Sequence, residues 1–320
     1  MPPPQPLPGT GPSPLRTPAQ RRRAGVLYGL SAYGLWGFLP LYFLTLAPAN
    51  AFEIVAWRVL FSILFCALVI SVTNKWRPFF DLLRRPRVVL TLGIAGILIF
   101  INWQTYVYAT MEGHVVEAAL GYFINPIVTI LLGVMVLRER MRPTQWVAVG
   151  VSLIAVIVLT AGYGSPPWIA LVLAFSFGLY GLIKKRVGPS VDALSGLTLE
   201  TLLLAPIAII QLVFVGATVG VTFGTVSIWH SLLLLSAGVV TAVPLLLFAA
   251  AARRIPLIYL GFIQYLTPIL QFVVGVSILH EPMTFERWVG FGLVWIALLI
   301  LTTDMIIAGR GPRRAALQPV

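Results

Sequence analysis

Arg58 and Glu200 are the ionisable residues set deepest in apolar sequence. A charge at such depth in a bilayer costs about 2.5 to 3.5 kcal/mol on insertion scales, so each needs a reason to be there. The two residues are 142 positions apart. We expect both to face the interior of a helical bundle, where they pair or where Glu200 takes up and releases a proton. The alternatives are snorkelling of Arg58 to the outer headgroups and a structural hydrogen bond at Glu200.

Polar and aromatic side chains in the apolar segments form a second set. They suit an organic solute in a mostly apolar cavity, although some must serve as interface anchors or in helix packing. These cavity candidates are Trp36, Asn102, Tyr106, Tyr122, Asn125, Tyr180, Gln264, Tyr265 and Thr267. Pro126 and Pro268 lie near the middle of two expected helices, where a proline removes a backbone hydrogen bond and kinks the helix.

Carboxylates stand near several expected helix ends. Glu53 and Glu117 begin apolar segments, where a negative charge favours the positive end of its own helix, so capping is the first interpretation, and Glu117 is also a candidate for charge coupling. Glu139 and Glu281 are 142 positions apart. We expect helix-end or gate contacts with nearby basic residues at both.

Enzymatic interpretations find little support. His114, His230 and His280 are scattered, and there is no H-E-x-x-H, G-x-S-x-G or P-loop motif. The single Cys66 has no partner for a disulfide or a thiolate metal site. The sequence therefore predicts no catalytic residue, no metal and no cofactor. It also lacks a filter-like loop of the kind a channel would use.

A repeat organises the elements that carry these residues. Residues 120–146 and 262–288 share the pattern P-x6-G-x3-L-x-E-x-M-x4-W at the constant offset of 142. The offset also relates Arg58 to Glu200 and Pro126 to Pro268. So many coincidences without a gap indicate two related halves.

The composition places these halves in a membrane. Hydrophobic residues make up 59% of the 320-residue chain, charged residues 10%, and the mean hydropathy is +0.95, far from the roughly 45 to 50% apolar and 25% charged residues of a soluble domain. The net charge of +12 comes from short basic clusters between apolar runs, which fits membrane orientation rather than nucleic acid. Ten runs are long enough to span a bilayer. They are approximately 25–46, 51–73, 88–109, 115–137, 143–161, 166–183, 191–215, 228–252, 256–279 and 285–307.

The basic residues set the expected orientation. With the N-terminus inside, 20 of the 22 Lys and Arg fall on the cytoplasmic side, and both termini are cytoplasmic. Five spans per half is an odd number, so the second half enters from the opposite side. The predicted fold is an all-α integral membrane protein of ten helices in two inverted five-helix repeats. The expected domains are a disordered Pro/Arg-rich tail at 1–24, a first repeat at 25–161, a second repeat at 166–307 and a cytoplasmic tail at 308–320.

Several runs resemble one known family. They are Leu120-Gly121-Tyr122-Phe123-Ile124-Asn125-Pro126, Ala174-Phe175-Ser176-Phe177, Tyr180-Gly181-Leu182 with Lys184-Lys185, Val243-Pro244-Leu245-Leu246 and Gly261-Phe262-Ile263-Gln264-Tyr265. They look like the RarD proteins, chloramphenicol-sensitivity permeases of the EamA branch of the drug/metabolite transporter superfamily. Glu53, Arg58 and Glu200 also fit, and the resemblance covers about residues 24–308. It implies two inverted EamA repeats, a central cavity and movement of small organic solutes across a bacterial cytoplasmic membrane.

The sequence thus predicts a carrier that alternates access by rocking helices 1 to 5 against helices 6 to 10. Its expected partners are a small-molecule substrate such as a drug, metabolite or amino-acid-like compound, the lipid bilayer and a coupling proton or exchanged solute. No nucleic acid is expected, and the carrier is a monomer or a homodimer. A membrane-embedded enzyme and an uncoupled channel are the alternatives.

Overall fold

A computed structural model describes residues 18–137, 142–163, 166–187, 191–252, 254–255 and 263–315. These residues are helical and contain no strand. The helices are α1 (Pro18–Gly37), α2 (Leu39–Leu44), α3 (Ala51–Val72), α4 (Trp76–Leu83), α5 (Pro86–Met111), α6 (Val115–Leu137), α7 (Pro143–Tyr163), α8 (Trp168–Val187), α9 (Ala193–Thr218), α10 (Ile228–Ala252), α12 (Leu266–Val273), the π-helix η2 (Val274–Ile278) and α13 (Phe285–Ala315).

Helix lies in every range expected to span. Among the described residues, α3, α5, α7, α9, α10 and α13 contain six stretches that are long and apolar enough to cross a membrane. Shorter apolar helices cover 115–128, 168–184 and 266–278. The sequence placed residues 18–24 and everything after 307 in tails, but α1 starts at Pro18 and α13 continues to Ala315. The boundaries differ because hydropathy predicts only where a helix leaves the apolar layer, and the backbone can remain helical beyond that point.

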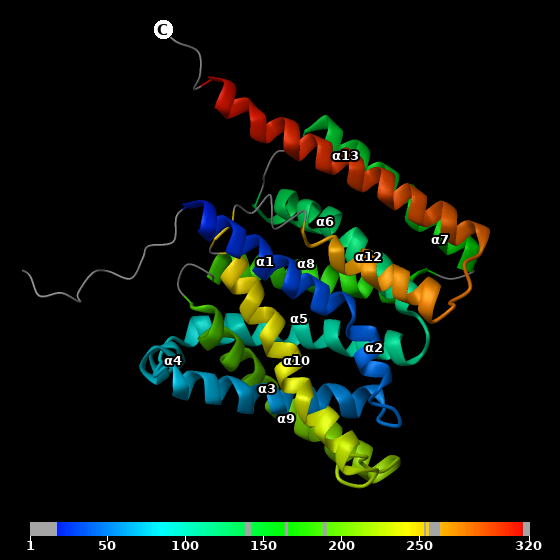
Figure 1. Ribbon diagram of the computed structural model, residues 1–320. Coiled ribbons are helices and arrows are strands. Elements are labelled where there is room, and N and C mark those ends of the chain that lie inside the picture. The colour runs from blue at the N-terminus through cyan, green and yellow to red at the C-terminus, as the bar shows by residue number, and fades with distance from the viewer. Residues whose placement is uncertain are drawn as a thin grey trace, which may run out of the picture.

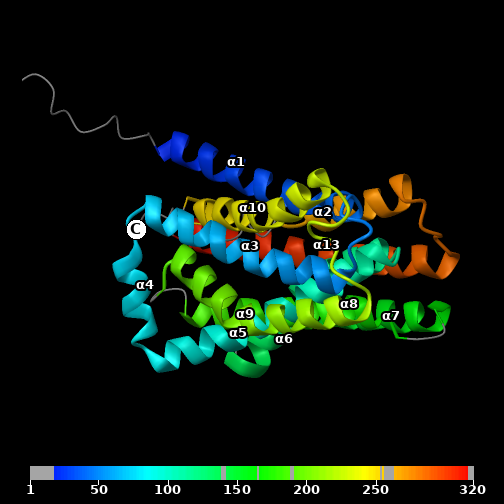
Figure 2. The same ribbon diagram turned by 90° about the horizontal axis from the view of Figure 1, so that it is seen from below.

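The helices stack in successive pairs, which Figure 1 shows from top to bottom. At one edge α7 packs along α13, followed by α6 with α12; α8 then packs against α6, and α1 packs against α12. At the other edge α3 packs against both α9 and α10. Helix α4 runs across one end of the bundle in both views, as Figure 2 makes clear.

Side-chain caps fix the starts of two long helices. Asn50 accepts the backbone N–H of Glu53 at 2.9 Å and begins α3. Asp192 accepts the N–H groups of Leu194 and Ser195, both at 3.1 Å, and begins α9. Burial alone would raise the pKa of Asp192, but the hydrogen bonds from Ser195 and Leu194 and the charge of Lys75 together outweigh it, and the pKa lies below its usual value. The ionised carboxylate therefore stabilises this helix start.

Candidate functional site

Arg58 of α3 is buried inside the bundle, with 4% of its surface exposed. Its Nε donates to Thr241 Oγ1 at 2.7 Å. The guanidinium carbon is 4.4 Å from the ring centroid of Trp103 and 5.5 Å from that of Phe43. Nη1 is buried and has no hydrogen-bond partner. The cation thus rests on aromatic faces and bonds one neutral oxygen, so its hydrogen-bonding capacity is not filled.

A close helix crossing sets this arrangement. A Cβ added at Gly238 of α10 would lie 2.4 Å from the backbone carbonyl carbon and oxygen of Phe61. Only glycine allows the two backbones to come this near. Thr241 follows Gly238 by one turn, and Arg58 precedes Phe61 by one turn. The crossing therefore brings Thr241 opposite Arg58.

Most of the cavity candidates form hydrogen bonds between helices. Gln271 of α12 donates from Nε2 to the Tyr106 hydroxyl at 2.8 Å and to the Trp36 carbonyl at 3.2 Å. The Tyr122 hydroxyl donates to Asn102 Oδ1 at 3.0 Å. Gln271 Oε1 is buried and has no partner. Sequence reasoning missed Gln271, because a lone amide in an apolar run is not distinctive.

The amides of α5 and α6 also bind α8. Asn102 Nδ2 donates to the Leu173 carbonyl and to Ser176 Oγ, both at 3.1 Å. Asn125 Nδ2 donates to the Ala174 carbonyl at 3.0 Å. These candidates therefore hold helices together in this conformation.

The sequence predicted kinks at Pro126 and Pro268 at mirrored depths, but in the structure the two prolines occupy different positions in their helices. Pro126 lies inside α6, but Pro268 lies in the first turn of α12, where a proline needs no break in the hydrogen-bond pattern. Gln264 and Tyr265 form a half-buried turn before α12, and Thr267 donates to a backbone carbonyl of α1 at 2.7 Å. The irregular segment of this span is η2, which no residue pattern announced.

Glu200 pairs with Lys184, not with Arg58. Lys184 Nζ is 2.7 Å from Glu200 Oε1, and the Tyr180 hydroxyl donates to Oε2 at 3.2 Å. The side chain of Glu200 is 1% exposed and that of Lys184 is 32% exposed. The pair joins α8 to α9, and the expected Arg58–Glu200 pair does not form.

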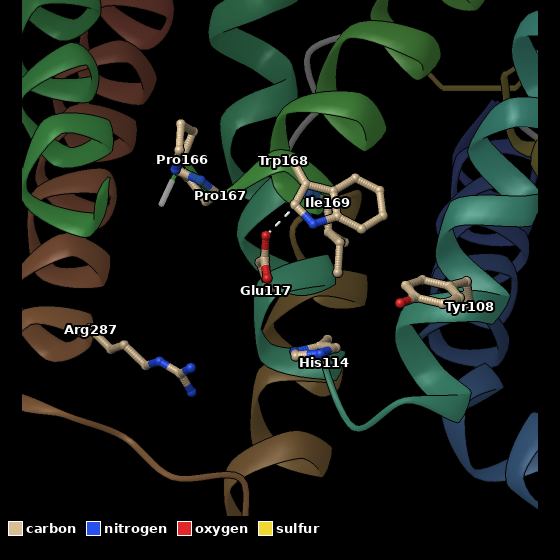
Figure 3. A pocket seen from close by; sticks show the side chains of 8 residues that line it. All are labelled: Tyr108, His114, Glu117, Pro166, Pro167, Trp168, Ile169 and Arg287. Atoms are coloured by element: carbon tan, nitrogen blue, oxygen red, sulfur yellow. Dashed lines mark hydrogen bonds between the residues drawn. The ribbon is translucent and has the colours of Figure 1, made fainter. Parts of the chain in front are cut away.

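Two carboxylates cap helices other than their own. Glu281, just beyond η2, accepts the N–H groups of Val115 at 2.6 Å and Val116 at 2.9 Å, one on each oxygen. Glu117 accepts the N–H of Ile169 at 3.1 Å, as Figure 3 shows. Glu117 was expected to cap its own helix, α6, but it caps α8. We call these three hydrogen bonds the carboxylate latch, which joins the ends of η2, α6 and α8. Burial raises the pKa of Glu281, although both backbone donors favour its ionised form.

Glu53 forms a similar cross-connection. Its Oε1 accepts the N–H groups of Thr222 at 2.8 Å and Phe223 at 3.1 Å, and the Trp57 indole N–H at 3.2 Å. It therefore anchors the segment that follows α9, besides starting its own helix. Glu139, the repeat partner of Glu281, lies outside the described residues.

A small pocket of about 170 Å³ adjoins the latch. Glu117 points into it from α6 and Arg287 approaches from the start of α13, as Figure 3 shows. The lining consists of Tyr108, His114, Glu117, Pro166, Pro167, Trp168, Ile169 and Arg287. Among the described residues no group of three or more His, Cys, Asp or Glu is placed to hold a metal ion.

Six apolar helices with spanning length and a buried polar centre define a multi-pass helical membrane protein. More particularly, the chain belongs to the EamA-like transporter family, whose family model matches it twice, at residues 23–161 and 166–303.

Three similar relatives carry the name RarD. The chain is 47% identical to Protein RarD of Streptomyces exfoliatus over 91% of this chain and 92% of that protein. It is 40% identical to Protein RarD of Escherichia coli (strain K12), over 91% and 98%. It is 30% identical to the Chloramphenicol-sensitive protein RarD of Pseudomonas aeruginosa, over 88% and 94%. One solved crystal structure shares the fold with a TM-score of 0.59 at 18% identity, covering 88% of this chain and 98% of that one.

Proposed function

We propose that the protein is a permease that moves small organic solutes across the bacterial cytoplasmic membrane by alternating access. Ten spans in two inverted repeats, with both termini in the cytoplasm, are part of this proposal. The supporting observations are the double family match, the charge distribution of the sequence and the packing of the helices.

The helix packing carries the argument. When the two halves are exchanged, each main contact between helices becomes a contact that the structure also contains. The contact of α3 with α10 corresponds to that of α5 with α9, and the contact of α5 with α8 to that of α1 with α10. The contact of α6 with α8 corresponds to that of α1 with α12. The pairs α3 with α9, α6 with α12 and α7 with α13 correspond to themselves. An inverted repeat with such packing has two related conformations, each open to one side.

The moving parts in this proposal differ from those expected from the sequence. Helices 1 to 5 do not form a body separate from helices 6 to 10, because the main contacts run between the halves. We propose instead that the contact between α6 and the segment α12–η2 opens and closes. In the proposed orientation the carboxylate latch lies at the external end and holds that end shut.

Counterflow in proteoliposomes tests the proposal. Vesicles loaded with an unlabelled solute should accumulate the same labelled solute transiently, with a rate that saturates. Screening drugs, amino acids and metabolites for a rise in melting temperature selects the solutes, because a ligand that binds the folded state stabilises it. Absence of counterflow for every stabilising solute would contradict the carrier. Conductance without saturation would identify a channel, and turnover of a solute by the purified protein would identify an enzyme.

Proton coupling is part of the same proposal. If Glu200 is the coupling site, Glu200→Gln should abolish the pH dependence of uptake. Unchanged rate and pH dependence would leave Glu200 as the partner of Lys184 and nothing more.

A further inference from the structure

We propose that Arg58 recognises a small organic carboxylate that also carries an N–H or O–H group, with Gln271 as acceptor for that group. The inference rests on the proposed carrier function and names the substrate class of its central site. It is carried by two buried polar atoms without partners, Arg58 Nη1 and Gln271 Oε1. Both lie among aromatic rings of the bundle interior.

Among the described residues no carboxylate pairs with Arg58, because the buried acids have different partners. Glu200 pairs with a lysine of α8, and Asp304 pairs with an arginine at the start of α7 at 3.1 Å. Glu117 and Glu281 accept backbone N–H groups in the carboxylate latch. Each of these negative charges is thus compensated away from Arg58.

Glu53 is the acid nearest to Arg58 in sequence, but it faces elsewhere. Five helical residues correspond to a rotation of about 140° around the axis, which places the two side chains on different sides of α3. Glu53 Oε1 accepts three N–H groups on that other side. Besides Thr241, the phenols of Tyr42, Tyr106 and Tyr122 lie near enough to interact electrostatically with Arg58.

An unpaired guanidinium at this depth is costly unless an anion accompanies it during part of the cycle. Guanidinium is planar and matches a carboxylate with two parallel N–H donors. Nε is engaged by Thr241, while Nη1 remains unused. Trp103 and Phe43 flank the cation and offer ring faces to the organic part of a solute.

Tyr106 links the two ends of the proposed site. Its ring lies 6.0 Å from that of Phe43, which contacts Arg58, and its hydroxyl accepts the Gln271 amide at 2.8 Å. The hydroxyl hydrogen of Tyr106 is therefore available for a solute. Gln271 Oε1 is an acceptor, which favours a solute with a donor of its own. A neutral isostere would leave the guanidinium uncompensated.

Thermal unfolding of the full chain in detergent tests the site. Cys66 is the only cysteine and is 1% exposed, so a thiol-reactive fluorophore reports unfolding at one position. The probes are lactate and 4-hydroxybenzoate, each compared with its amide, lactamide or 4-hydroxybenzamide. At saturation the carboxylates should raise the melting temperature by about 2 to 4 °C, and the amides should not.

Two arginine variants complete the test. Arg58→Met should weaken the affinity for the carboxylates about 10- to 100-fold, because a charge-assisted hydrogen bond is lost, without lowering the melting temperature of the ligand-free protein. Arg254 also lies over an aromatic ring, at 5.2 Å from Tyr28, but it is exposed, and Arg254→Met should keep the full response.

Four results would overturn the inference. They are equal stabilisation by acids and amides, no stabilisation by either acid, a response that survives Arg58→Met, and a ligand-free Arg58→Met variant that melts earlier. The carrier function is judged separately by counterflow. Saturable counterflow of neutral solutes with none of carboxylates would refute the anion site and keep the carrier, whereas no counterflow of any solute would refute the carrier.

Discussion

Removing either partner of the Lys184–Glu200 pair should have unequal effects, because the two side chains are buried to different extents. The carboxylate is 1% exposed and the lysine 32% exposed. Lys184→Met leaves a carboxylate that has no route to water and keeps only the Tyr180 hydroxyl as donor. Glu200→Gln leaves an ammonium on a long, flexible stem that reaches solvent by a change of rotamer.

The magnitudes follow from these environments. Breaking a buried pair so that one charge stays buried costs about 3 to 5 kcal/mol. Losing one charge-assisted hydrogen bond while the remaining charge is solvated costs about 1.5 to 3 kcal/mol at most. Lys184→Met should therefore destabilise more than Glu200→Gln. The double variant should return close to Glu200→Gln, since no charge is then left unpaired.

The Cys66 unfolding assay measures all three variants. The exposed pair between Arg84 and Asp81, at 3.6 Å with 83% and 63% of the side chains exposed, supplies the control. Asp81→Asn should change stability by less than about 1 kcal/mol. A Glu200→Gln variant that is no more stable than Lys184→Met, or a double variant worse than Lys184→Met, would refute the reasoning.

Three further predictions concern the elements that position the site. Gly238→Ala should cost about 1 to 3 kcal/mol, because its Cβ meets the Phe61 backbone, whereas Gly181→Ala, with no atom within 4 Å, should be neutral or stabilising in the same assay. Asp192→Ala should lower the free energy of unfolding by about 1 kcal/mol at neutral pH. Because folding lowers the pKa of Asp192, this loss should be present above the usual pKa of the carboxyl group and should vanish as pH falls through the pKa of the folded state. The pKa of Glu281 is raised by burial, so the closed latch should lose stability as pH rises through that value. Labelling of a cysteine introduced beside the latch should therefore quicken with pH more steeply in wild type than in Glu281→Gln, because ionisation of the thiol itself contributes equally to both.

Hydropathy was sufficient to locate the spanning helices, because a bilayer requires apolar helices of a set length. It missed α4, which is short and amphipathic: Phe79 and Leu82 are buried, while Phe80 and Leu83 are exposed. Aromatic residues at helical spacing between basic clusters were the available signal. No comparable signal exists for η2, because the i to i+5 pattern depends on how α12 packs.

The identity of the interacting partners was the least predictable part of the site. The repeat singled out Glu281, but its acceptor role depends on the free N–H groups of α6, and every helix start has such groups. Lys184 was counted as a cytoplasmic charge, although its long side chain reaches Glu200 inside the bundle. In both cases the length and rotamer of the side chain decide which partner it meets, and the rotamer cannot be read from a sequence.

The symmetry of the repeat itself argues against a pair between Arg58 and Glu200. Each is the eighth residue of its helix, α3 or α9, and therefore lies about 10 Å along that helix from its start. In the inverted repeat that we propose, the two helices start at opposite faces, so in an apolar layer of about 30 Å the two residues would differ in depth by about 10 Å. A salt bridge needs its charged atoms within about 4 Å. Equivalent residues of an inverted repeat meet only near the middle of their helices. Away from the middle each must find a different partner, which for Glu200 is Lys184 and for Arg58, in our proposal, is the solute.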